Sequence, residues 1–208
     1  MVHGGIMETL KEATAEQHRD AERRRLQREL VSGQVPPKVY AAWLGQMLLL
    51  HRALGEEIGR RRETEPALRI VQDDGRHVAN LRADLAALGA TSDAIEPLPA
   101  TREAAAAIAA AGARDPVALL GYNYVLEGSM NGNRFIARAL APRLPAPATA
   151  YLDPYGESQR SVWQAYRERM NALPWDTARA DAVVAAAREL FRRIGALSDE
   201  IVGDPVGV

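Results

Sequence analysis

The chain has 208 residues, of which 47% are hydrophobic and 25% are charged, a balance that predicts one globular domain and excludes a disordered chain. Its formal net charge is -1, so no overall field attracts nucleic acid or an anionic membrane surface. It has no cysteine, no apolar run long enough to span a bilayer and no start resembling a signal peptide, so disulfides and thiolate ligands are excluded and we expect a cytoplasmic protein.

Helix is the only repeated element that the sequence indicates, because apolar positions recur every three or four residues. Helices are predicted over Met7–Leu30, Pro36–Arg62, Thr64–Gly89, Thr101–Ala111, Val117–Ala141, Pro154–Leu173 and Asp176–Leu197. Residues 90–100 form a predicted loop, and Gly112 is expected to break the fourth helix. Asp115 and Pro116 suit the start of the fifth. Residues 1–6 are expected to be a flexible leader and residues 199–208 a loose tail of this single all-α domain, 1–208.

The stretch Leu10–Glu22 carries the first candidate site residues. Thr14, His18 and Glu22 recur every four residues, so they share one face of the predicted helix. A carboxylate one turn after a histidine can hold one imidazole nitrogen and leave the other neutral and available to a metal. The same spacing also occurs in an ordinary exposed helix with a His/Glu contact.

The predicted helix Val117–Ala141 is unusual because it contains Gly121, Gly128 and Gly132, although each glycine costs about 1 kcal/mol relative to alanine inside a helix. Gly128 and Gly132 share a face without side chains, so a flat ligand could approach the backbone and the helix could bend. Close packing of two helices is the alternative explanation. Small polar groups able to hold ordered water flank this face: Ser129, Asn131 and Asn133.

Three stretches, in this order, resemble the heme oxygenase family. LKEATAEQHRDAE at residues 10–22 resembles the proximal helix, and YVLEGS at residues 124–129 with Gly132 resembles the kinked distal helix. YRERMN at residues 166–171 resembles a late helix with a propionate-binding arginine, and an arginine there can bind a carboxylate as a rigid fork. The resemblance implies a helical bundle that holds heme between the proximal and distal helices.

The resemblance also implies a reaction, in which heme is both cofactor and substrate. Dioxygen and electrons from a reductase or ferredoxin convert it to biliverdin, carbon monoxide and ferrous iron. By this match His18 is the axial iron ligand and Glu22 orients it. The remaining implied roles fall on the distal catalytic wall of Gly128, Ser129, Gly132 and Asn133 and on the propionate side with Lys11, Tyr124 and Arg167.

Two positions depart from the family's pattern. Many members have aspartate in place of Ser129, and many have glycine in place of Asn133. These departures bear on turnover and regioselectivity rather than on heme binding, so a heme sensor, carrier or storage protein without efficient ring opening is the main alternative. His51 and His77 are expected at the core edge or the surface.

Two other enzyme classes fit the sequence less well. A helical di-iron oxidase needs Glu-x-x-His pairs, and no histidine of this chain has a glutamate three residues before it. A nucleophilic hydrolase needs a G-x-S-x-G turn after a strand, and Ser129 lies in no such turn.

Overall fold

The computed structural model describes residues 5–72 and 75–203, and this part of the chain is helical without any strand, as the sequence predicts. The α-helices are α1 Ile6–Ala13, α2 Ala15–Glu22, α3 Arg25–Val31, α4 Pro37–Arg61, α5 Arg76–Ala87, α6 Pro99–Arg114, α7 Leu119–Leu140, α8 Gln159–Ala172 and α9 Thr177–Val202. Short 3-10 helices connect them: η1 Pro66–Ile70, η2 Ser92–Ala94, η3 Pro116–Ala118, η4 Ala141–Arg143 and η5 Gly156–Ser158.

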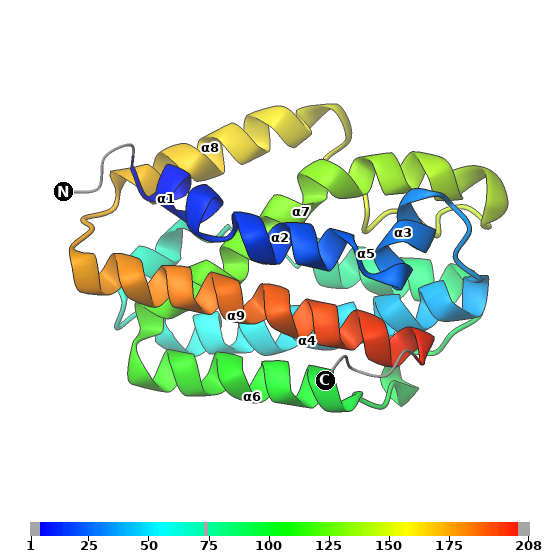
Figure 1. Cartoon of the computed structure of the whole chain (residues 1–208), viewed down its shortest axis with the longest axis horizontal. Coiled ribbons are helices and arrows are strands. Elements are labelled where there is room, and N and C mark those ends of the chain that lie inside the picture. Colours follow the sequence, from blue (N-terminus) through cyan, green and yellow to red (C-terminus); the bar gives the residue numbers. More distant parts are fainter. Residues whose placement is uncertain (1–4, 73–74, 204–208) are drawn as a thin grey trace.

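The helices form one bundle in which α9 packs against α6 and α7, and α4 packs against α5 and α6 (Figure 1). Helices α1 and α2 lie along one side of α9, and α7 changes direction along its length, as expected for the kinked helix (Figure 1). Within the described residues, no helix is long and apolar enough to cross a membrane. Helix α3, which follows α2, packs against α7.

The core follows the apolar periodicity of the long helices. The inner face of α4 is buried at Tyr40, Trp43, Leu44, Met47, Leu48, Leu54 and Ile58. His51 belongs to the same stripe and is partly buried. The predicted helix start at Asp115 is confirmed, since its carboxylate accepts from Val117 N. Asp176 likewise accepts from Arg179 N at the start of α9, and Gly89 takes a φ of 73° after α5.

The prediction of one helix over Met7–Leu30 is wrong, because this segment forms α1, α2 and α3. Thr14 interrupts the first two: its φ and ψ are -105° and 2°, and its Oγ1 donates to Leu10 O at 2.7 Å. Arg24 is extended, with φ -64° and ψ 147°, so α3 starts in a new direction. The predicted leader is too long, since Ile6 already lies in α1 with 1% of its surface exposed. Residues 1–4 lie outside the described part.

Several other predicted boundaries need correction. The segment Thr64–Gly89 contains η1 and α5, and Gly75 between them has a φ of 74°, which a right-handed helix cannot continue through. Gly112 lies inside α6 instead of ending it. A Cβ there would meet Glu57 Oε2 and Arg61 Cζ at 3.2 Å, so this glycine serves the packing of α6 on α4.

The last two helices also differ from the prediction. Helix α8 begins at Gln159 rather than Pro154, because η5 precedes it. Helix α9 continues to Val202, and Ser198 and Asp199 are buried, so residues 199–202 are not a loose tail. Gly203 ends the helix with a φ of 70°. Residues 204–208 lie outside the described part.

Candidate functional site

A cavity of about 840 Å³ lies between α2 and α7, within the range of about 300–1,000 Å³ that small-molecule and cofactor pockets occupy. Helix α2 supplies His18 and Glu22, and α7 supplies the opposite wall from Val125 to Ile136. Apolar and aromatic side chains complete the cavity: Trp43 and Met47 of α4, Tyr151 of the segment before α8, and Phe191 and Ile194 of α9. A largely apolar ligand suits this lining.

His18 projects from a helix that buries none of its residues. Its Nδ1 lies 3.4 Å from Glu22 Oε2, and its ring meets the Phe191 ring edge-on at a centroid distance of 5.4 Å. The histidine side chain is 55% exposed. Because Glu22 lies beside Nδ1, and no described residue bonds Nε2, that nitrogen is available to a ligand.

The glycines of α7 have different surroundings. A Cβ on Gly132 would meet no atom within 4 Å, whereas one on Gly128 would lie 3.2 Å from Trp163 of α8. Both glycines line the cavity. A Cβ on Gly121 would lie 2.1 Å from Val183 O, so this glycine lets α7 approach α9 closely. The bare wall is therefore Gly132 above all, and helix packing explains Gly121.

The polar side chains of the α7 wall are turned back onto their own helix. Ser129 Oγ donates to Leu126 O at 2.7 Å, and Asn133 Nδ2 lies 3.4 Å from Ser129 Oγ. Asn131 Nδ2 donates to Gly128 O at 3.0 Å. In the part of the chain that the structure describes, α7 contributes no carboxylate to this wall.

Lys11, Tyr124 and Arg167 do not line the cavity but lie on α1, α7 and α8. Lys11 Nζ is 3.1 Å from Glu8 Oε1, and the lysine side chain is 71% exposed. Burial raises the pKa of Tyr124, against the opposing effects of a hydrogen bond with Thr14 and the charge of Arg167. Arg167 makes no ion pair within residues 5–72 and 75–203. Tyr124 precedes Gly128 by one turn, so this group lies toward the α1 and α8 end of α7.

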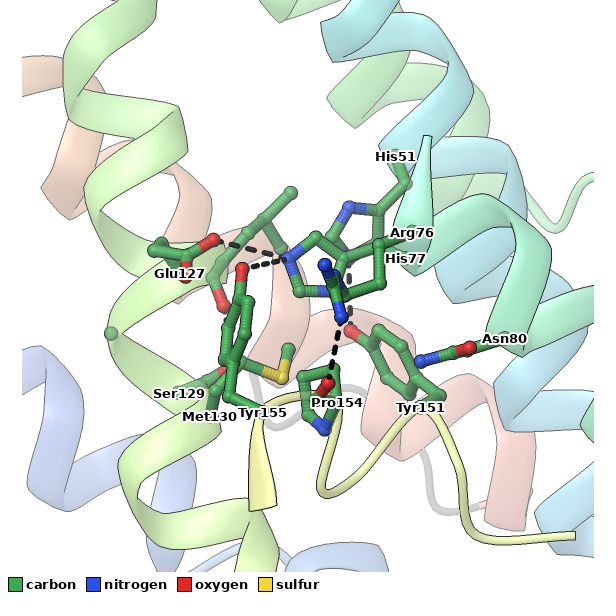
Figure 2. A network of polar contacts seen from close by, with 12 residues as sticks. His51, Arg76, His77, Asn80, Glu127, Ser129, Met130, Tyr151, Pro154 and Tyr155 are labelled. Carbon is green, nitrogen blue, oxygen red and sulfur yellow. Dashed lines mark hydrogen bonds and ion pairs between the residues drawn. The ribbon is translucent and has the colours of Figure 1, made fainter. Parts of the chain in front are cut away.

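Figure 2 shows a second polar group, which the sequence did not predict. His51 Nε2 lies 3.0 Å from the hydroxyl of Tyr151, and the His51 and His77 rings stack with centroids 5.0 Å apart. His77 Nε2 lies 3.1 Å from Glu127 Oε2 and 3.3 Å from the hydroxyl of Tyr155 (Figure 2). The inner-stripe position of His51 was the one signal available in the sequence, since its partners come from distant segments.

Burial determines the protonation of this group. It lowers the pKa of His51 well below its usual value, and the nearby His77 lowers it further, so the His51 imidazole is neutral. Burial and the charge of Glu127 raise the pKa of Tyr151, so its hydroxyl keeps its proton. Across the described residues, no three or more His, Asp or Glu side chains cluster to hold a metal ion. The carboxylate and histidine set of a di-iron site is therefore not assembled in that part of the chain.

Comparison with known proteins gives a consistent result. A family model described as heme oxygenase matches residues 5–200. Heme oxygenase 1 of Gallus gallus is 28% identical over 195 residues, which cover 89% of this chain and 66% of that protein. A heme oxygenase of Xanthomonas campestris is 36% identical over 119 residues, or 56% of this chain and 63% of that protein. The matched regions thus span slightly less than two thirds of these relatives.

The fold is also found among solved structures. Heme oxygenase-1 of the cyanobacterium Synechocystis, solved in complex with heme, superposes with a TM-score of 0.87 at 21% identity. The superposition covers 96% of this chain and 93% of the cyanobacterial chain. At that identity the likeness establishes the architecture, and the chemistry must be argued from the residues of the site.

Proposed function

The chain belongs to the heme oxygenase family, and from this premise we propose that it cleaves heme to biliverdin, carbon monoxide and ferrous iron. Dioxygen and electrons from a reductase or ferredoxin drive the reaction, and heme is both cofactor and substrate. The observation that carries the proposal is the pairing, across one cavity, of His18 with the bare backbone at Gly132. The cytoplasmic location stays a prediction.

The residues present fit a heme. Helix α2 buries none of its residues, and His18 offers Nε2 beside the cavity. Trp43 lines the same cavity, and its buried Nε1 has no partner among the described residues. Gly132 leaves open space where any other residue would place a side chain. When bound, heme supplies an iron that can bind and activate dioxygen.

Each side of the site then has its own task. His18 would hold the iron through Nε2, and Glu22, whose Oε2 lies 3.4 Å from Nδ1, would orient the ring and increase its basicity. Arg167 and Lys11 supply the positive charges that pair with the heme propionates, and Tyr124 adds a hydroxyl group close to Arg167. The distal wall of Gly128, Ser129, Gly132 and Asn133 shapes the space beside the backbone of α7.

The rival function is heme binding without efficient ring opening. It is favoured by the hydroxyl of Ser129, which donates to Leu126 O within α7 rather than facing the cavity as an acid. Both functions need His18 in the same role. Only ring opening consumes the heme.

The deciding experiment compares the wild-type protein with His18→Ala. Wild-type protein loaded with hemin and supplied with oxygen and ascorbate, or with a reductase system, should convert the Soret spectrum to that of biliverdin and release carbon monoxide. If its heme persists while a known heme oxygenase turns over in the same mixture, ring opening is wrong and heme binding remains. His18→Ala should lose the normal ferric spectrum, since the proposal makes this exposed imidazole the axial ligand; an unchanged spectrum would contradict that role.

A further inference from the structure

A second cavity of about 450 Å³ lies along a different face of α7. Asn123 and Glu127 line it, whereas Gly128 and Gly132 line the larger cavity between α2 and α7. Gln72 and Arg76 line the second cavity and are exposed, so it reaches the surface. Leu126 of α7 lines both cavities, which places them on either side of one helix.

His51 and Tyr151 connect the two cavities. Tyr151 lines the larger cavity, His51 lines the smaller one, and their polar atoms are 3.0 Å apart. His77 stacks on His51 and is itself bonded to Glu127 and Tyr155 (Figure 2). The chain of contacts therefore starts at the larger cavity and ends among polar groups of the smaller one.

The smaller cavity has the polar lining that water needs. Three buried polar atoms there have no partner among the described residues: His77 Nδ1, Asn123 Oδ1 and the Tyr166 hydroxyl. Buried polar atoms of this kind are usually satisfied by ordered water. Such water can exchange protons with bulk solvent through the exposed end at Gln72 and Arg76.

The larger cavity has a need for such a path. Ring opening consumes protons, yet the Ser129 hydroxyl is engaged by Leu126 O and no carboxylate of α7 lines this wall within the described residues. A neutral imidazole can accept a proton at one nitrogen while it releases one from the other. The neutral His51 next to the Tyr151 hydroxyl meets this requirement.

We propose that His51 and Tyr151 form a proton relay from the smaller cavity into the larger one, with His77, Glu127 and Tyr155 at its outer end. Water of the smaller cavity gives a proton to Nδ1 of His51 and regains one from bulk solvent, as another proton passes from Nε2 to the Tyr151 oxygen. The phenolic proton passes to water in the larger cavity. One proton enters and one leaves, so both side chains stay neutral. The inference rests on the proposed function, because it supplies protons to that reaction.

The charged and titratable groups around His51 come from several elements. They are Arg76 and His77 of α5, Glu127 of α7, Tyr166 and Arg169 of α8, and Tyr151 and Tyr155 of the segment before α8. Any pH dependence of the relay therefore reflects all of these residues together and not the titration of one of them. The test therefore changes one relay atom at a time.

Tyr151→Phe removes the relay hydroxyl, and Tyr40→Phe is a matched control. Both tyrosines are fully buried, and both rings contact Trp43. The Tyr40 hydroxyl donates to Ala148 O at 3.0 Å and takes no part in the relay. His51→Gln is the second relay variant, because an amide can bond to the Tyr151 hydroxyl but cannot pass a proton on as imidazole does.

The first measurement is the rate of biliverdin formation by the heme-loaded full chain, in H2O and D2O and across pH. Tyr151→Phe and His51→Gln should slow turnover by roughly a hundredfold or more, within the range known for general acid–base groups, and should increase the solvent isotope effect. Tyr40→Phe should keep the wild-type rate, isotope effect and pH profile. Wild-type values in both relay variants would overturn the relay.

The second measurement does not depend on turnover. The pH midpoint of the ferric heme spectrum should rise in Tyr151→Phe and shift in His51→Gln, while Tyr40→Phe keeps the wild-type midpoint. If wild-type protein binds heme without making biliverdin, the proposed function fails. The pH midpoint of the ferric heme spectrum then still decides whether His51 and Tyr151 are coupled to the heme. Unchanged midpoints in both relay variants would then overturn the relay. Should Tyr151→Phe fail to fold, His51→Gln decides by the same criteria.

Discussion

His18 and Tyr151 face the same cavity in very different states. The His18 side chain is 55% exposed on α2, whereas Tyr151 is fully buried. Asp84 fixes the backbone at Tyr151, accepting from its N–H at 2.8 Å and from the N–H of Ala150 at 2.9 Å. Burial raises the pKa of Asp84 to about 6 against these two hydrogen bonds, so its carboxylate is ionised near neutral pH. The His18 side of the cavity is thus exposed, whereas the Tyr151 side is buried and fixed by hydrogen bonds to Asp84.

At the same scale, Arg167→Ala tests the anchor of the heme. The variant should still bind heme through His18, with affinity lower by roughly tenfold, or about 1.4 kcal/mol, because one charge-assisted contact is lost. Loss of the anchor lets the heme rotate about the iron, so the ratio of biliverdin isomers should change. The isomers are measured by chromatography of the product.

Arg160→Ala is the control for Arg167→Ala. It removes an exposed guanidinium from the same helix, α8, outside both cavities. It should keep the wild-type isomer ratio. The same ratio in Arg167→Ala would count against a propionate contact.

At the scale of helices, local signals in the sequence predicted more than long-range ones. The cap at Asp115 and the i,i+4 pair of His18 and Glu22 lie within one turn, and the structure has both. Gly112 was misread because its role depends on α4, which packs against it from elsewhere in the chain. His51 and Tyr151 are 100 residues apart, and no sequence period joins them. The sequence does not show tertiary contacts, and these decide which of two possible roles a residue such as Gly112 has.

Two glycine substitutions in α7 separate helix packing from ligand binding. Gly121→Ala should destabilise the fold by roughly 1–3 kcal/mol or more, because its Cβ would lie 2.1 Å from Val183 O. Gly132→Ala should stabilise the heme-free protein by up to about 1 kcal/mol, since its Cβ meets open space. The same methyl group enters the cavity wall, so heme affinity or turnover should fall. Denaturant unfolding and heme titration measure the two effects.

Gly59→Ala provides the reference for these variants. Gly59 is an exposed position inside α4 where a Cβ would also meet nothing within 4 Å. This change should give the helical gain of Gly132→Ala without its effect on heme. If Gly132→Ala binds and turns over heme like Gly59→Ala, the bare wall at Gly132 does not face the heme.

For the whole molecule, the notable feature is the shallow packing of α2 on α9, where the His18 ring meets Phe191. Arg188 Nε of α9 donates to Ala13 O at 2.7 Å just before α2, and Arg24 pairs with Asp199 of α9 at 2.7 Å just after it. Between these points α2 buries none of its residues. The rest of the bundle encloses a continuous core. Among the described α-helices, the one without a buried residue is therefore one that lines the cavity.

This arrangement predicts that heme completes the packing of α2. Heme bound at a thousandfold excess over its dissociation constant should stabilise the fold by about 4 kcal/mol, and the melting temperature should rise accordingly. In hydrogen exchange followed by mass spectrometry, peptides of α2 should exchange rapidly without heme and slowly with it, while peptides of α9 stay protected throughout. His18→Ala, loaded to the same heme occupancy, should lose most of the new protection in α2. Equal exchange of α2 with and without heme in the wild-type protein would mean that α2 is not the proximal wall.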